Sequence, residues 1–324
     1  MVNDLLRKAQ EYDVETIVSG ITNHLPMVLI ALDELGAPID RMNEFYDAYC
    51  NKLQPLKRSV LSNSFDWRLN LGKKESFSEY LEFYLIQISS HGFESAIRTY
   101  IDVLLQGCAA AAFHGLIRLS YGVSACNYTE VAFGLAHMSS HYEPIPKSRE
   151  LNSSASEIIN NALEEFLGYS AEGNSITERL SKISKHPLFI NVNYHPSSLT
   201  LGELNNLFSD LYLQTNDFTV LHTITSCHAM RLVLPYVTDC DAAIRAYWSS
   251  IISAILSVKK LTFDKFHNYD LTPVENLNLS SIINSNNDHV IKLAHTCIEE
   301  YKHYENLNTL KVLNFVFNQS KMKT

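Results

Sequence analysis

The sequence is poor in the two residues that most often interrupt regular structure. It has only 11 glycines and 9 prolines among 324 residues, and apolar residues recur at helical spacing through most of the chain. This spacing is typical of amphipathic helices, whereas a strand-rich fold needs a turn at roughly every 8 to 12 residues. No internal repeat of fixed period is present, which disfavours a solenoid. We therefore predict an all-α fold in which residues 1–324 form a single large domain of the helical-bundle type.

Paired cysteines, excess positive charge and long apolar runs are also missing, and each absence excludes a class of protein. The six cysteines include no CxxC pair, which indicates reduced thiols and not a disulfide framework. A formal net charge of -9 argues against a protein that binds the nucleic-acid backbone. No apolar run is long enough to cross a bilayer, and the first residues lack a secretory pattern. We expect a cytoplasmic protein with no nucleic-acid or membrane partner.

Familiar catalytic motifs are missing as well. There is no Walker loop, no GxGxxG, no GxSxG and no HExxH. A ferritin-like dimetal site needs two Glu-x-x-His pairs, and only Glu300 with His303 fits that spacing. A facial-triad oxygenase needs a carboxylate ligand, and the apolar helical stretches offer only Asp288, at an expected helix start. A metal site in this chain must therefore take its anionic ligand from an unusual source.

What the sequence does contain is a set of histidines in strongly apolar helical stretches. These are His24, His114, His222 and His289. A single histidine of this kind is more often a hydrogen-bonded core residue than a ligand. Four neutral imidazoles that converge in a helical interior, however, suit iron, zinc or copper. We therefore expect a buried metal site between central helices.

Lys292 lies three residues after His289, on the same face of the expected helix. A lysine seldom faces a core without a partner, although its long stem can carry the amine out to solvent. His228 follows His222 by six residues, which in a regular helix means about 120° around the axis and about 9 Å along it. We interpret His228 as a residue that either supports a metal ligand or has a structural role, together with Arg231 one turn later.

Four motifs, in order along the chain, resemble the signatures of the questin oxidase-like family. They are Asn23-His24-Leu25-Pro26-Met27, Ala110-Ala111-Ala112-Phe113-His114-Gly115-Leu116-Ile117-Arg118, Phe218-Thr219-Val220-Leu221-His222-Thr223-Ile224-Thr225 and Asp288-His289-Val290-Ile291-Lys292. The resemblance extends from about residue 4 to residue 302.

The resemblance implies an all-helical iron oxygenase that needs no organic cofactor. Fungal relatives open a ring of an anthraquinone with one iron, held by histidines and a carboxylated lysine. Carried over to this chain, His24, His114, His222 and His289 would be the imidazole ligands of Fe²⁺, and Lys292 would be the carboxylated lysine. The partners implied are O₂ and a small aromatic substrate, with either a monooxygenase or a dioxygenase outcome.

Three alternatives stay open at this level. His228 or His295 could replace His222 or His289 in the ligand set. The same ligands could hold zinc in a hydrolase, because histidine alone does not select iron over zinc. The chain could also be a metal-free helical binding protein that keeps the core of the family.

Overall fold

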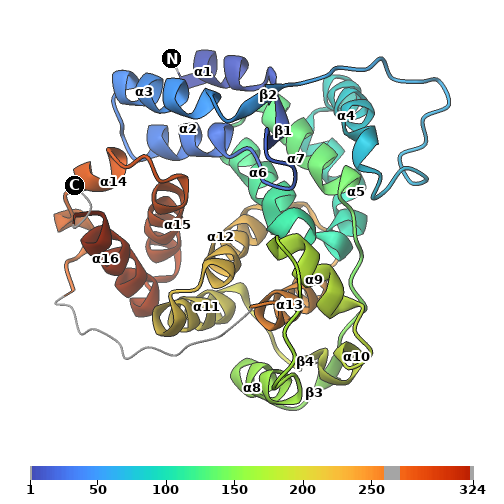
Figure 1. Ribbon diagram of the computed structural model, residues 1–324, viewed down its shortest axis with the longest axis vertical. Helices are drawn as coiled ribbons and strands as arrows, with labels where there is room; N and C mark the ends of the chain where they lie inside the picture. The colour runs from blue at the N-terminus through green and yellow to red at the C-terminus, as the bar shows by residue number, and fades with distance from the viewer. Residues whose placement is uncertain (1, 259–270, 322–324) are drawn as a thin grey trace. The chain divides into compact units, whose positions relative to one another are not determined.

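The computed structural model describes residues 2–258 and 271–321 (Figure 1). Helices dominate this part of the chain, which contains sixteen α-helices and only two small sheets of two strands each. The predicted all-α fold is therefore confirmed. None of the described helices combines the length and the apolar character that a membrane crossing requires.

The described residues form two compact units. The first unit contains residues 2–56, 205–216 and 271–321, and the second contains residues 57–204 and 217–258. The expectation of a single domain stays a prediction.

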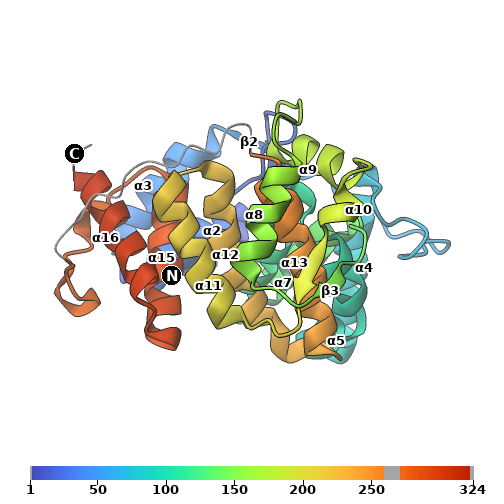
Figure 2. The same cartoon turned by 90° about the horizontal axis from the view of Figure 1, so that it is seen from below.

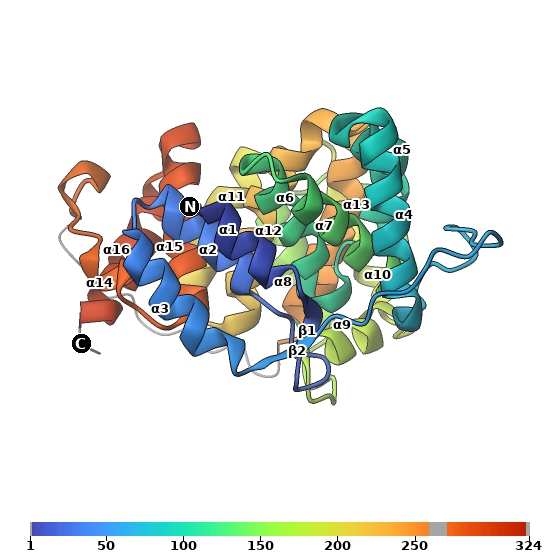
Figure 3. The same ribbon diagram turned by 90° about the horizontal axis from the view of Figure 1, so that it is seen from above.

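The first unit is built from helices of both ends of the chain. Its elements are α1 (Val2–Ala9), β1 (Tyr12–Thr16), α2 (Leu25–Glu34), α3 (Ile39–Cys50), β2 (Leu53–Pro55), most of α11 (Leu201–Thr215), α14 (Ser280–Ile283), α15 (Asp288–Tyr304) and α16 (Leu307–Lys321). The first three helices pack against one another (Figure 3), and α15 packs against both α2 and α16 (Figure 2). Helix α2 is the centre of this unit, because every residue from 25 to 32 is buried.

The second unit contains the remaining helices. Its elements are α4 (Phe77–His91), α5 (Phe93–Leu104), α6 (His114–Ser124), α7 (Tyr128–Ser140), β3 (Arg149–Leu151), α8 (Ala155–Glu165), α9 (Ile176–Ser184), α10 (Phe189–Val192), β4 (Tyr194–Pro196), α12 (Phe218–Val233) and α13 (Cys240–Leu256). Helix α6 packs against α7 and α12, and α12 packs against α13. Strands β3 and β4 pair in parallel.

Helices α6 and α7 approach each other closely because glycines face the contact. A Cβ atom on Gly134 of α7 would lie 2.5 Å from the backbone of Leu119 on α6. The same contact contains a fully buried ion pair, in which Arg118 Nε donates to Glu130 Oε2 over 2.8 Å. Gly115, next to His114, serves the same contact, because a Cβ atom there would lie 2.8 Å from the backbone nitrogen of Met138 on α7.

Two stretches with helical spacing of apolar residues are interrupted in the structure. The range 281–304 divides into α14 and α15, with residues 284–287 between them. The stretch from residue 107 to 122 is not one helix either, because residues 111–113 take a left-handed conformation before α6 begins at His114. Both interruptions lie directly before a residue of the predicted metal site, and each places that residue in the first turn of a helix.

Candidate metal centre

His24 lies directly before α2, and its neighbour Asn23 fixes that position. The Asn23 side chain donates to the carbonyl oxygen of Asp13 over 2.9 Å and accepts from the backbone N–H of Leu25, also over 2.9 Å. Asn23 is fully buried, so both polar ends of its amide are satisfied inside the protein. The Asn-His-Leu-Pro sequence therefore holds His24 between β1 and the first turn of α2.

The other residues of the first unit's site begin α15. Asn287 is the N-cap of this helix, because its Oδ1 accepts from the backbone N–H groups of His289 and Val290. The rings of His24 and His289 meet edge to face, with their centroids 4.8 Å apart. Two histidines separated by more than 260 residues are thus neighbours in the first unit.

Asp288 holds both of these imidazoles. His24 Nδ1 lies 2.8 Å from Asp288 Oδ2, and His289 Nδ1 lies 2.7 Å from Asp288 Oδ1. Burial alone would raise the pKa of the Asp288 carboxyl, but the hydrogen bonds from His24 and His289 outweigh it and hold this pKa below its usual range. The ionised carboxylate can only accept, so Nδ1 of each ring carries the hydrogen. Each Nε2 is then the nitrogen with the lone pair.

Tyr49 supports the same arrangement from α3. Its hydroxyl accepts from the backbone N–H of His24 over 3.1 Å and donates to Asp288 Oδ2 over 3.4 Å. Burial, together with the nearby charge of Lys292, lowers the pKa of His24 to about 3. Burial also lowers the pKa of His289. Both imidazoles are therefore neutral at physiological pH, the state in which histidine binds a metal.

Lys292 is buried one turn after His289 and is 3% exposed. Within residues 2–258 and 271–321 its amine makes no hydrogen bond or ion pair. Burial lowers the pKa of Lys292 to about 8, although the negative charge of Asp288 acts in the opposite direction. A buried ammonium without a partner is unfavourable. The neutral amine is the form that reacts with CO₂, so this side chain has the chemistry that a carbamate requires.

His114 of the second unit follows an unusual backbone segment. Ala111, Ala112 and Phe113 have φ angles of 49°, 53° and 66°, and a left-handed conformation costs a residue with a side chain about 1–2 kcal/mol. This left-handed turn aims the Ala111 carbonyl oxygen at the ring of His114, whose Nδ1 lies 2.5 Å away. Backbone strain of this kind is often found at functional sites.

His222 lies in the first turns of α12. Asp217 caps this helix by accepting from the backbone N–H groups of Thr219 and Val220. His222 Nδ1 donates to the Phe218 carbonyl oxygen over 2.8 Å. The rings of His114 and His222 are neighbours, with their centroids 5.1 Å apart. The structure therefore brings together a histidine pair in each unit.

All four histidines share one hydrogen-bonding state. In every case Nδ1 donates to an oxygen that can only accept, whether a carboxylate or a backbone carbonyl. A metal-bound histidine usually donates its second ring nitrogen in this way, because the bond fixes the tautomer and the ring orientation. The four imidazoles are therefore prepared to bind through Nε2.

The two alternative histidines have other surroundings. His295 Nε2 lies 2.5 Å from Glu34 Oε2, so this ring is bonded to a carboxylate of α2. His228 Nδ1 lies 3.4 Å from an Arg231 nitrogen, which fits the structural role expected for it. These contacts favour His289 and His222 as candidate ligands.

Sequence reasoning considered Asp288 only as a metal ligand. Its contact with His24 joins residues 264 positions apart, and helical periodicity carries no information about such a contact. The adjacent histidine, with Asn287 as a helix cap, was the one signal in the sequence that placed this carboxylate at a helix start.

Two aromatic residues near the histidines differ in exposure, because Phe113 is fully buried whereas Phe218 is 52% exposed.

A comparison with protein-family models identifies residues 21–204 as questin oxidase-like. This range covers more than half of the chain and contains the motifs around His24 and His114. No curated protein matches the sequence. The family's description names an oxidase, which implies an oxidoreductase that acts on a small molecule. Together with the all-α fold, the match shows that the chain belongs to the questin oxidase-like family.

Proposed function

We propose that the chain is a non-haem iron-dependent oxygenase that cleaves a ring of, or hydroxylates, a polycyclic aromatic or phenolic substrate. The observation that carries this proposal is the common state of four histidines, in each of which Nδ1 donates to an oxygen, so that Nε2 is the nitrogen with the lone pair that a metal requires. The family match supports an oxidase.

In this proposal His24, His114, His222 and His289 bind one Fe²⁺, and Lys292 supplies the anionic ligand as a carbamate. The residues fit this role chemically. Neutral imidazoles suit iron, and the Lys292 amine is buried without a hydrogen-bond or ion-pair partner in the described residues. A carboxylated lysine would provide the anionic ligand, because the apolar helical stretches contain no carboxylate other than Asp288. Asp288 is already occupied by two imidazoles.

Bound iron would supply the activation of O₂, and the protein would supply geometry and exclusion of water. Asp288 and Tyr49 orient the two imidazoles of the first unit, while the carbonyls of Ala111 and Phe218 orient those of the second. Phe218 stacks edge to face on His222 at 4.9 Å and is half exposed, so it is placed to contact a flat aromatic substrate.

Metal analysis of the purified protein tests the proposal. After anaerobic reconstitution with Fe²⁺, we expect about one iron per chain, and we expect that iron to be lost in His114→Ala and in Lys292→Ala. His137→Gln is the matched control, because His137 is a buried histidine of α7 outside the proposed set. Mass spectrometry of the intact protein in bicarbonate checks for the added carboxyl group on Lys292.

Three outcomes would contradict the proposal. Failure to bind any transition metal would favour a metal-free binding protein. Binding of zinc with hydrolase activity, and no O₂ consumption with iron, would favour a zinc hydrolase. Equal iron content in His114→Ala and in His137→Gln would show that the metal is held elsewhere. O₂ consumption with a hydroxylated anthraquinone as the test substrate separates the first two outcomes from the proposed oxygenase.

A further inference from the structure

The second unit contains a cavity that the proposed metal chemistry does not use. It has a volume of about 450 Å³ and is bordered by α5, by the segment that leads into β3, and by α13. Its floor is apolar and buried, and includes Leu105, Ile145 and Ala243. This volume is within the range of about 300–1,000 Å³ that is usual for small-molecule sites.

The cavity does not include the proposed metal ligands. Tyr247 of α13 contacts α12, because its hydroxyl bonds to Ser226 and to the carbonyl oxygen of Thr223. Ala242 and Arg245, which line the cavity, lie about 140–160° around the helix from Tyr247 at about 100° per residue. These two residues therefore face away from the contact with α12, the helix that carries His222.

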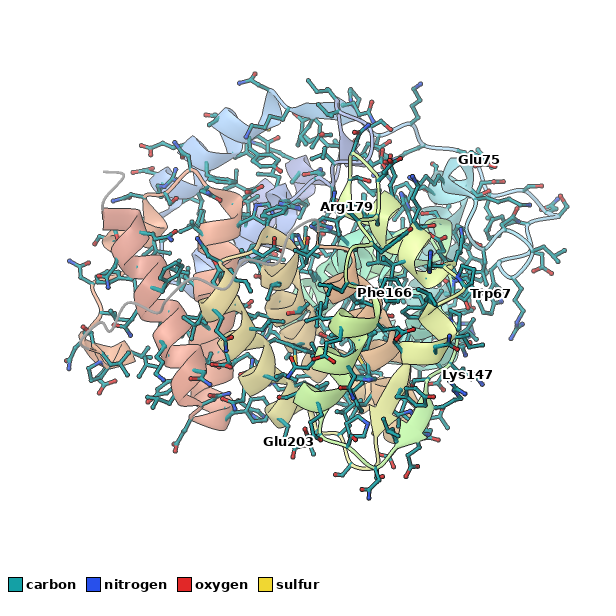
Figure 4. All side chains as sticks on the ribbon, turned by 60° about the horizontal axis from the view of Figure 1, so that its bottom comes forward. Trp67, Glu75, Lys147, Phe166, Arg179 and Glu203 are labelled. Atoms are coloured by element: carbon teal, nitrogen blue, oxygen red, sulfur yellow. The ribbon has the colours of Figure 1, made fainter. Side chains whose placement is uncertain are left out.

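Two cations line the cavity without an anionic partner. Lys147 is exposed (Figure 4) and Arg245 is half-buried. Neither forms a hydrogen bond or ion pair through its side chain within the described residues. Two other cations of the same unit do have such a partner, as in the contacts of Lys185 with Glu143 and of Arg58 with Glu82. The positive charge in the cavity is therefore available to a ligand.

The cations share one end of the cavity with a polar network. Ser148, next to Lys147, bonds through its hydroxyl to Nδ1 of His195 over 3.0 Å. Burial lowers the pKa of His195 and the positive charge of Arg245 lowers it further, whereas the charge of Glu150 acts in the opposite direction. When the neutral imidazole carries its hydrogen on Nδ1, it donates to the Ser148 oxygen, and the serine hydroxyl hydrogen can then donate to a ligand.

The acidic residues of the cavity lie elsewhere and already hold backbone groups. Asp239 caps α13 by accepting from the N–H of Ala242 over 2.9 Å, and Asp102 accepts from the N–H of Thr238 over 3.1 Å. Asp239 precedes Arg245 by six residues, which is about 9 Å along a helix. The acidic end and the cationic end of the cavity are therefore separate.

We propose that this cavity binds a small organic carboxylate whose apolar body rests on the floor formed by Leu105, Ile145 and Ala243. The carboxylate lies between Lys147 and Arg245 and accepts from the Ser148 hydroxyl. A charge-assisted pair with each cation gives the site its preference for anions. The apolar floor gives it a preference for a carboxylate that has a hydrocarbon or aromatic body.

Calorimetric titration tests this proposal with benzoate and hexanoate as probes. Benzamide has the body of benzoate without the charge, and inorganic phosphate has charge without a body. We expect benzoate or hexanoate to bind at least about tenfold more tightly than benzamide and phosphate, since tenfold is the effect of one lost interaction of about 1.4 kcal/mol. Metal-free protein serves as the sample, so failure of the proposed iron site does not affect the result.

Substitutions locate the binding site. Arg245→Gln and Lys147→Gln are each expected to weaken benzoate binding about tenfold or more, whereas Lys182→Gln, an exposed lysine of α9, changes nothing. Circular dichroism confirms that the variants are folded. The proposal is overturned if neither carboxylate binds at millimolar concentration, if phosphate binds as tightly as benzoate, or if both cavity variants bind benzoate like the unchanged protein.

Discussion

Asp288→Asn separates the roles of charge and geometry at the candidate metal centre. The carboxylate accepts from His24 Nδ1 and His289 Nδ1 at 2.8 and 2.7 Å. An asparagine amide has nearly the same shape, but only one of its two polar atoms can accept. Its nitrogen would face one imidazole as a donor. That ring must then accept through Nδ1 and carry its hydrogen on Nε2, where it cannot bind a metal.

The expected loss can be estimated from this change. Removing the acceptor of a metal-bound histidine typically weakens metal binding about 10- to 100-fold, which corresponds to about 1.4–2.7 kcal/mol. Here one substitution disturbs two imidazoles that share a single acceptor, so we expect a value near the upper end. Tyr49→Phe removes the 3.4 Å contact with Asp288 Oδ2 and the acceptor of the His24 backbone N–H, but it leaves both bonds between Asp288 and the imidazoles, so it should have a smaller effect in the same direction.

Two measurements check this prediction. Competition with a chelator gives the iron affinity, and ¹⁵N NMR of the histidine rings gives the tautomers in the metal-free protein. Asp239→Asn is the matched control, because it makes the same change at the N-cap of α13, where asparagine caps as well as aspartate. The reasoning is refuted if Asp288→Asn keeps its iron affinity within about threefold of the control and both rings keep the hydrogen on Nδ1.

Three further substitutions test other parts of the structure. Lys292→Met should abolish iron binding. It should also raise the free energy of unfolding of the metal-free protein by about 1–3 kcal/mol, because it removes a buried amine without a hydrogen-bond or ion-pair partner in the described residues. A lower free energy of unfolding in denaturant titrations would contradict this. Ala112→Gly should change the free energy of unfolding by less than about 0.5 kcal/mol, because relief of the left-handed strain offsets the larger loss of backbone entropy that glycine has on folding. Ala132→Gly, in the regular helix α7, should lower it by about 1–2 kcal/mol. Equal losses of melting temperature in the two variants would show that residue 112 is not strained. Glu130→Leu should lower the free energy of unfolding by about 3–5 kcal/mol, because it leaves the charge of Arg118 buried without its carboxylate. Adding Arg118→Met should recover most of this loss. A double variant that is no more stable than Glu130→Leu alone would disprove the pairing.

Much of the fold follows from local signals in the sequence. Apolar residues at helical spacing predicted the helices, and Asp288 was expected at a helix start. The structure agrees, because α15 begins at Asp288 and the Asn287 side chain caps its first turn. Burial of His114 and His222 was predicted from their apolar surroundings and is confirmed. For Lys292 the sequence also allowed an amine that reaches solvent, and the structure shows that the side chain is buried. These features could be predicted because each depends on residues within one or two turns of the same helix.

The left-handed segment before His114 could not be predicted in the same way. Alanine is the strongest helix former, so Ala-Ala-Ala-Phe favours a continuous right-handed helix. Tertiary packing overrides this preference, and three residues in succession take positive φ angles. The preference of each alanine for a helical conformation is small, whereas packing of the buried Phe113 and His114 side chains constrains the whole segment. The position of the Ala111 carbonyl follows only from the folded structure.

The acceptors of the four imidazoles also determine how sensitive each half of the candidate site is to substitution. His114 and His222 donate to backbone carbonyls three and four residues earlier, and no side-chain replacement removes a carbonyl. His24 and His289 both depend on the single carboxylate of Asp288. The orientation of His114 and His222 therefore follows from local backbone geometry. The orientation of His24 and His289 instead requires a contact between distant parts of the chain. Substitution of Asp288, which is not itself a proposed ligand, should accordingly weaken metal binding much more than substitution of any neighbour of His114 or His222.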